Sequence, residues 1–124
     1  LYKRISAVET EAELDDLQAE TIDRFGLLPE PAKNLFRIAR LRIAAARLEV
    51  ERLDVSPAGG SVTFASTTPI DPGALILMVQ RSGRSMRFDG PSKLRFTGQH
   101  DDAEQRFDAA DRMLGGLARC VTQQ

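Results

Sequence analysis

The residues that could act as a nucleophile and its base are few in this sequence. Cys120 is its one cysteine and His100 its one histidine. A thiol or serine nucleophile needs an imidazole or carboxylate within reach. Cys120 falls in the last turn of a predicted helix, where the helix dipole raises the pKa of a thiol and makes it less reactive. We therefore predict no catalytic residue in this chain.

The sequence also offers few side chains that could bind a metal ion. His100 stands in "TGQHDD", at a predicted junction between a loop and a helix, and we expect it to be a cap or an exposed side chain. As a metal ligand it would have only Asp101, Asp102 and Glu104 nearby. One thiol and one imidazole fall short of a structural zinc set. We predict no metal in this domain.

Paired carboxylates and glycine loops give no better evidence of chemistry. Asp15 and Asp16 are adjacent, as are Asp101 and Asp102, and neighbours on a helix point about 100° apart instead of converging on one substrate. The glycines form neither a G-x-x-x-x-G-K-[ST] loop nor a G-x-G-x-x-G turn after a strand. We predict solvated carboxylates and no nucleotide cofactor in this domain.

Charged residues on the first strongly periodic segment are more informative. In "ETEAELDDLQAETIDR", residues 9–24, Glu20, Asp23 and Arg24 are spaced i, i+3, i+4, so a helix places them together. They form a patch of mixed sign that could bind a complementary surface, or they belong to an ordinary solvent-facing stripe. The apolar stripe on the opposite side comprises Leu14, Leu17, Thr21 and Phe25.

A second helix, predicted from about residue 31 to 48, has a basic side. Arg42 falls within its apolar arc, and we expect a structural cross-link from Arg42 to a carboxylate or a carbonyl. The apolar side comprises Leu35, Ile38, Ala39, Ala45 and Ala46. The basic side comprises Lys33, Arg37, Arg40 and Arg47. This side is a weaker candidate for a partner interface or for nucleic acid, because no aromatic residues interleave with it.

These helices belong to an α+β pattern. Gly26 is placed to end the first helix, Pro31 suits the first turn of the second, and Asp71 with Pro72 starts a short apolar helix that we expect to be buried. "SPAGG" and Asp89-Gly90 supply turns for two β-hairpins. We predict one compact domain, an antiparallel sheet of two hairpins packed with about four helices. The predicted strands lie at 50–55, 61–65 and on either side of Asp89-Gly90, and the later helices at 72–82 and 101–119.

The bulk composition narrows the functional class. The 124 residues carry a net charge of −1, so no global basic field attracts nucleic acid or anionic membrane. A single cysteine suits a reducing, cytoplasmic location. No apolar run is long enough to span a membrane, and no signal-peptide pattern opens the chain. Because "LYKRI" begins at Leu1 within a pattern, we expect a domain of a longer protein.

Three stretches resemble a known family. They are "YKRIS" at residues 2–6, "IDRFGLLPEPAKNLFRIARLR" at residues 22–42 and "FDGPSKLRF" at residues 88–96. Together they are similar to the carboxy-terminal domain of the bacterial transcription-repair coupling factor, Mfd. The resemblance runs from Tyr2 to the last helix, although residues 56–85 carry no matching motif. It divides the chain into a linker at 1–8, from a preceding motor domain, and a regulatory domain at 9–124.

The resemblance implies a regulatory and non-catalytic role. In the family, upstream motor domains use ATP and Mg and contact DNA to displace stalled RNA polymerase, and an N-terminal UvrB-like module recruits UvrA for nucleotide excision repair. The terminal domain covers the UvrA-binding surface of that module as an autoinhibitory clamp. The family's clamp contacts fall on Glu20, Asp23 and Arg24 of this sequence. The resemblance implies no cofactor in the domain itself and no membrane partner.

Two alternatives stay open on the residues alone. A nucleic-acid-contacting accessory domain would use the basic side of the second helix. A hydrolase would rest only on the presence of acidic residues.

Overall fold

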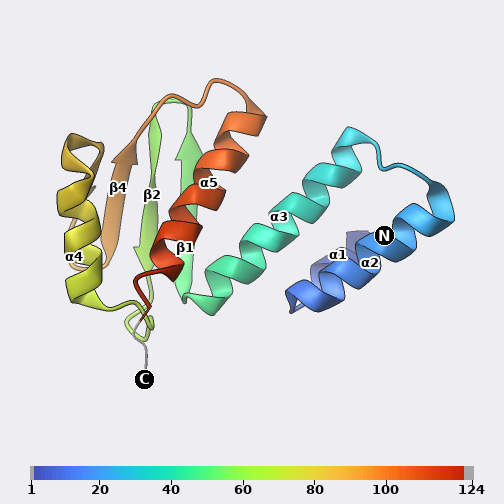
Figure 1. Ribbon diagram of the computed structural model, residues 1–124, viewed down its shortest axis with the longest axis horizontal. Coiled ribbons are helices and arrows are strands. Elements are labelled where there is room, and N and C mark those ends of the chain that lie inside the picture. The colour runs from blue at the N-terminus through green and yellow to red at the C-terminus, as the bar shows by residue number, and fades with distance from the viewer. Residues whose placement is uncertain (1, 122–124) are drawn as a thin grey trace. The chain divides into compact units, whose positions relative to one another are not determined.

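The chain folds as two compact units, and the computed structural model describes residues 2–121 of it (Figure 1). The first unit extends to Ala44 and the second begins at Ala45. Leu1 and residues 122–124, which the predicted linker and regulatory domain include, lie outside the described residues. The helices are α1 (Tyr2–Ala7), α2 (Glu11–Phe25), α3 (Glu30–Arg47), α4 (Pro72–Arg81) and α5 (Ala103–Ala118). The strands are β1 (Val50–Ser56), β2 (Gly59–Phe64), β3 (Met86–Phe88) and β4 (Lys93–Thr97), and a 3-10 helix spans Gly83–Ser85.

Local sequence signals set the ends of α2. The Thr10 side chain accepts a hydrogen bond from the Glu13 backbone N–H at 3.1 Å and caps the first turn. Gly26 ends the helix with φ of 85°, a left-handed conformation that glycine adopts without a Cβ penalty. The predicted stop at Gly26 is confirmed, and the helix begins at Glu11, two residues into the predicted segment 9–24.

The core of the first unit joins α1, α2 and α3. Leu14 and Leu17 of α2 are buried, as predicted. Eight buried residues form the cluster: Ile5, Val8, Leu14, Leu17, Leu28, Phe36, Ala39 and Ile43. The α1 helix was not predicted, and the burial of Ile5 and Val8 makes it part of this core. A linker role for residues 1–8 stays a prediction.

Two apolar residues predicted for this core are exposed instead. Phe25 is 75% exposed and Ile38 is 54% exposed. Phe25 is the last residue of α2, where no further turn of the helix follows to pack beside it. Ile38 lies outside the buried stripe because Phe36, Ala39 and Ile43 define that stripe at spacings of three and four. Leu35 is partly buried and packs against the cluster, as expected.

The second unit is built on a four-stranded antiparallel sheet with the strand order β1-β2-β4-β3. Both predicted hairpins are confirmed, and the pairing of β2 with β4 joins them. Gly60 is needed in β2 because a Cβ there would lie 2.5 Å from the ring of Phe96 and 2.2 Å from the Asp54 carbonyl oxygen. The α+β class predicted from the sequence is confirmed.

Helices α4 and α5 complete the second unit. In Figure 1, α5 lies in front of the sheet, and it packs against β1, while α4 packs against β3. Val62, Leu94 and Leu117 are fully buried between sheet and helix. The Asp71 cap of α4 is confirmed by its hydrogen bond from the Ala74 N–H at 3.1 Å. The expected burial of α4 is wrong, because only Leu75 is buried while its other large apolar side chains reach solvent, including Ile76 and Leu77.

No helix among residues 2–121 is long and apolar enough to cross a membrane.

Candidate functional site

The predicted patch lies on the exposed face of α2. Glu20, Asp23 and Arg24 are all exposed, on the side of the helix opposite the buried Leu14 and Leu17. The structure therefore brings the three predicted residues onto one accessible surface. Within the described residues, the Asp23 side chain forms no hydrogen bond or ion pair, so its carboxylate is available to a partner.

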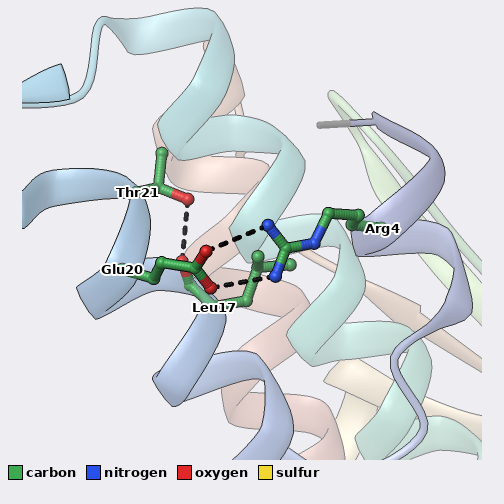
Figure 2. A network of polar contacts seen from close by, with 4 residues as sticks. All are labelled: Arg4, Leu17, Glu20 and Thr21. Atoms are coloured by element: carbon green, nitrogen blue, oxygen red, sulfur yellow. Dashed lines mark hydrogen bonds and ion pairs between the residues drawn. The ribbon is translucent and has the colours of Figure 1, made fainter. Parts of the chain in front are cut away.

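Glu20 already has a cation from another helix. The Arg4 guanidinium of α1 donates two hydrogen bonds to the Glu20 carboxylate, at 2.9 and 3.2 Å (Figure 2). The side chains of Arg4 and Glu20 are 58% and 48% exposed. These hydrogen bonds hold the pKa of Glu20 below its usual value and raise the pKa of Arg4. Glu20 is therefore ionised at neutral pH and paired with an exchangeable, solvent-accessible cation.

Arg4 was missed from the sequence alone, and it enlarges the patch. We call the set of Arg4, Glu20, Asp23 and Arg24 the α2 patch. A signal was present, since "YKRIS" places a cation before the acidic helix. That signal could not be read without knowing that residues 2–7 form a helix packed beside α2.

Thr21 shows how α2 tolerates a polar residue on its buried side. The Thr21 hydroxyl donates a hydrogen bond to the Leu17 carbonyl oxygen at 2.7 Å, one turn earlier in the same helix (Figure 2). This bond satisfies the hydroxyl inside the core, where an unpaired polar group would be costly. Thr21 therefore supports the helix without taking part in the α2 patch.

Two of the four cations on the basic side of α3 already have partners. Arg40 forms an ion pair with Asp15 of α2 at 2.8 Å, and Arg37 is half-buried and has a partner. Arg42 donates hydrogen bonds to the carbonyl oxygens of Ile5 and Val8 at 3.2 and 3.0 Å, which confirms the predicted cross-link. Lys33 and Arg47 are exposed, near opposite ends of the helix. The stripe is therefore interrupted as a surface for nucleic acid.

His100 and Cys120 have structural surroundings. His100 is buried, not exposed as expected, because its ring packs edge-on against Phe96 and its Nδ1 lies 2.9 Å from the Ser56 carbonyl oxygen. Burial raises the pKa of the Cys120 thiol, which makes it a poorer nucleophile. Within residues 2–121, no group of three His, Cys, Asp or Glu side chains is arranged to hold a metal ion.

Comparisons with known proteins agree with the resemblance drawn from the sequence. A family model described as the TRCF domain matches residues 1–75. The transcription-repair-coupling factor of Haemophilus influenzae is 40% identical over 94% of this chain and 10% of its own length. That of Escherichia coli is 40% identical over 86% of this chain and 9% of its own length. The chain thus spans about a tenth of these curated relatives.

A solved structure gives the same fold. The crystal structure of the C-terminal domain of a transcription-repair coupling factor superposes with a TM-score of 0.74 at 19% identity, covering 97% of this chain and 78% of that one. At 19% identity the match shows that the two chains share a fold, and nothing more. Together with the sequence relatives, it agrees with the predicted architecture.

Proposed function

The chain belongs to the TRCF domain family, and we propose that it is the regulatory, non-catalytic domain of a transcription-repair coupling factor. In this role it is an autoinhibitory clamp that binds the UvrB-like module of the same parent protein and covers the surface that UvrA recognises. The motor's use of ATP and Mg and its contacts with RNA polymerase belong to other parts of that parent, and those parts also make most of its contacts with DNA. The observation that carries the proposal is the exposed α2 patch, with two cations and two anions on one surface.

The geometry of the α2 patch suits a partner with its own mixed charges. Asp23 is exposed and without an ion pair within the described residues, so it can accept hydrogen bonds from an arginine or lysine of the partner. Arg24 lies beside Glu20 closely enough to contribute to lowering the pKa of that carboxyl. A surface with both signs favours one docking orientation, because a rotated partner would meet like charges.

The Arg4–Glu20 pair makes the contact exchangeable. Solvent-exposed ion pairs contribute little to stability, because water and salt screen them. A cation from the partner can therefore replace Arg4 on Glu20 at small cost and leave the core of the unit intact. Arg4 in turn becomes free to bind an acidic group of the partner.

A weak contact is sufficient for a clamp within one chain. Two tethered surfaces see an effective concentration of the order of millimolar. An intrinsic Kd of about 10 μM then keeps the clamp closed in about 99% of molecules. A differential binding energy of a few kcal/mol, supplied by polymerase engagement or by the motor cycle, is enough to open it.

The test reverses two charges of the α2 patch in the full parent protein. Glu20→Lys with Asp23→Lys turns attraction into repulsion. If the equilibrium constant for closing falls about a hundredfold, the closed and open forms become equally populated. Binding of UvrA, measured by titration calorimetry, should rise towards that of a parent lacking residues 1–124. The chain should keep its fold, because both side chains are exposed.

A matched control separates the patch from the overall charge of α2. Glu13→Lys with Asp16→Lys makes the same change of net charge on exposed positions of the same helix, nearer its N-terminus. This variant should bind UvrA as weakly as the parent. The proposal is wrong in its choice of surface if the patch variant also stays at the parent level while deletion of the domain raises UvrA binding.

A further inference from the structure

One face of the sheet in the second unit is left uncovered by the helices of that unit. In antiparallel pairs, directly opposed residues point to the same face. Leu53, Val62 and Leu94 oppose one another and belong to the core face that α4 and α5 cover. The residues one position along each strand therefore point the other way. Most of them are exposed or half-buried, while Ser61 in the middle of the sheet is 8% exposed.

The register aligns cations on this second face, which we call the open face. Across the strands, Asp54 opposes Ser61, Ser61 opposes Arg95, and Arg95 opposes Arg87. In a second row, Arg52 opposes Thr63, and Thr63 opposes Lys93. The positions of both rows are occupied by charged and hydroxyl side chains alone. A third row adds Ser56, Gly59 and Thr97.

The cations of the open face outnumber its anions. Arg52 pairs with Asp54 at 2.8 Å, and Arg95 pairs with Asp89 of the β3–β4 turn at 2.5 Å. Both pairs are exposed to solvent. Three cations remain beyond these pairs: Arg84 of the 3-10 helix, Arg87 and Lys93. Arg87 and Lys93 both help to lower the pKa of Asp89, after the larger effect of Arg95, so their charges lie near that carboxylate.

A shallow hollow lies beside these cations. Its volume is about 600 Å³. Three arginines, Arg84, Arg87 and Arg95, line it together with one carboxylate, that of Asp54. The rest of the lining is made of small and hydroxyl residues and Phe96: Ser56, Ala58, Gly59, Gly60, Ser61, Ser85, Phe96 and Thr97. Among the described residues, the Arg84 side chain forms no hydrogen bond or ion pair, and Arg87 has no carboxylate within ion-pairing distance. The hollow therefore presents more guanidinium groups than carboxylates, because its one lining carboxylate, Asp54, is already paired with Arg52, and hydroxyl groups lie next to them.

The composition of the open face points to one kind of anion. Protein partners bury an apolar and aromatic centre, and the strand positions of this face offer no apolar side chain. Single-stranded nucleic acid is bound by stacking its bases on aromatic rings, and the aromatic residues of these strands, Phe64, Phe88 and Phe96, alternate onto the core face. Contacts to duplex phosphates need only arginine, lysine, serine and threonine donors. Interfaces with DNA are also polar and positively charged.

We propose that the open face, centred on Arg84, Arg87 and Arg95, is a docking surface for the phosphate backbone of duplex DNA. Binding there is electrostatic and independent of base sequence. Neutralising about three phosphates gives a salt dependence with a slope near −2.7 in log units, so affinity falls about 40-fold between 50 and 200 mM salt. At physiological salt the Kd lies in the non-specific range of roughly 10⁻⁴ to 10⁻⁶ M.

The test uses this 124-residue chain and a fluorescent duplex of random sequence, with fluorescence anisotropy as the readout. Arg84→Glu with Arg87→Glu should weaken binding about tenfold or more at low salt. It should also reduce the slope of log affinity against log salt concentration by the amount expected for the loss of about two phosphate contacts. Arg84→Gln with Arg87→Gln should give a smaller loss of the same kind. Circular dichroism checks that each variant is folded. If the glutamate variant is misfolded, the binding of the glutamine variant is used to test the proposal instead.

Two variants with the same change of charge locate the surface. Arg112→Glu with Arg119→Glu alters exposed positions in and just after α5, and Lys33→Glu with Arg47→Glu alters the exposed cations of α3. Both should bind duplex within about twofold of the parent. An equal loss in all three variants, or a loss confined to the α3 variant, overturns the proposal. Absence of measurable duplex binding overturns it as well, as does tighter binding to a polyglutamate peptide of equal charge.

Discussion

The two units of this chain hold together in different ways. The first unit packs helices that are neighbours in sequence around eight buried residues and ties them with polar side chains, such as Arg4 to Glu20 and Arg42 to the carbonyl oxygens of α1. The second unit depends on pairings between distant segments. Its β2 pairs with β4, and the Asp71 N–H donates to the Cys120 carbonyl oxygen at 2.7 Å.

This difference matters for the two proposed surfaces. The α2 patch belongs to the small helical unit, and one of its members, Glu20, is bound by a side chain of α1 that can exchange. The open face belongs to the sheet, where backbone pairing fixes the positions of Arg87 and Arg95 relative to each other. A surface that must be released suits the first arrangement, and a permanent electrostatic surface suits the second.

Separating the two units should have the largest effect. We expect a fragment of residues 48–124 to fold and melt cooperatively, because it retains the whole sheet with α4 and α5. A fragment of residues 1–47 should lose most of its helical signal, because chains of about this length rarely bury enough apolar surface to be stable alone. Far-UV circular dichroism with thermal melts measures both. A cooperative melt of the fragment 1–47 would show that the helical unit does not need the sheet.

Truncating one core residue should have the next largest effect. Leu117→Ala removes a fully buried side chain of α5 and should lower the free energy of unfolding by about 3 kcal/mol. Phe25→Ala is the matched control from the first unit, because Phe25 is large and apolar but exposed, and it should change that free energy by no more than about 0.5 kcal/mol. Urea denaturation of the full chain compares them. Equal losses would mean that Phe25 is buried in solution.

The smallest effect concerns the ion pair within the first unit. Because Arg4 lowers the pKa of Glu20, the pair stabilises the fold at pH values above the ordinary glutamate range, and this contribution is lost as the pH falls through the lowered pKa. Arg4→Ala should move the pKa of Glu20 up towards its ordinary value and remove that part of the acid sensitivity. A carboxyl NMR titration measures the shift. An unchanged Glu20 pKa in the variant would show that the pair does not persist in solution.

The sequence by itself determined the order of the elements from α2 onwards, but not α1. Gly26, Asp71 with Pro72, and Asp89-Gly90 act on the backbone next to them, through allowed φ, capping and turn geometry, so their effects need no knowledge of distant residues. The exposed side of α2 with Glu20, Asp23 and Arg24 followed from helical spacing for the same reason. The family resemblance was also contained in the sequence.

Only the tertiary structure decided which apolar residues are buried and which charges meet. Periodicity places Phe25 and Ile38 near an apolar stripe, but their exposure depends on where neighbouring helices end and how wide the contact is. The burial of His100 depends on Phe96 and on the Ser56 carbonyl oxygen, 44 residues earlier.

The tertiary structure also decides which charged side chains meet. Arg4 meets Glu20 across 16 residues, and the sequence alone does not say which acidic residue of α2 the cation would reach. The row of Arg87, Arg95 and Ser61 exists because β4 lies between β2 and β3. Strand order is chosen by the packing of the whole unit, because any antiparallel neighbour satisfies the same backbone hydrogen bonds.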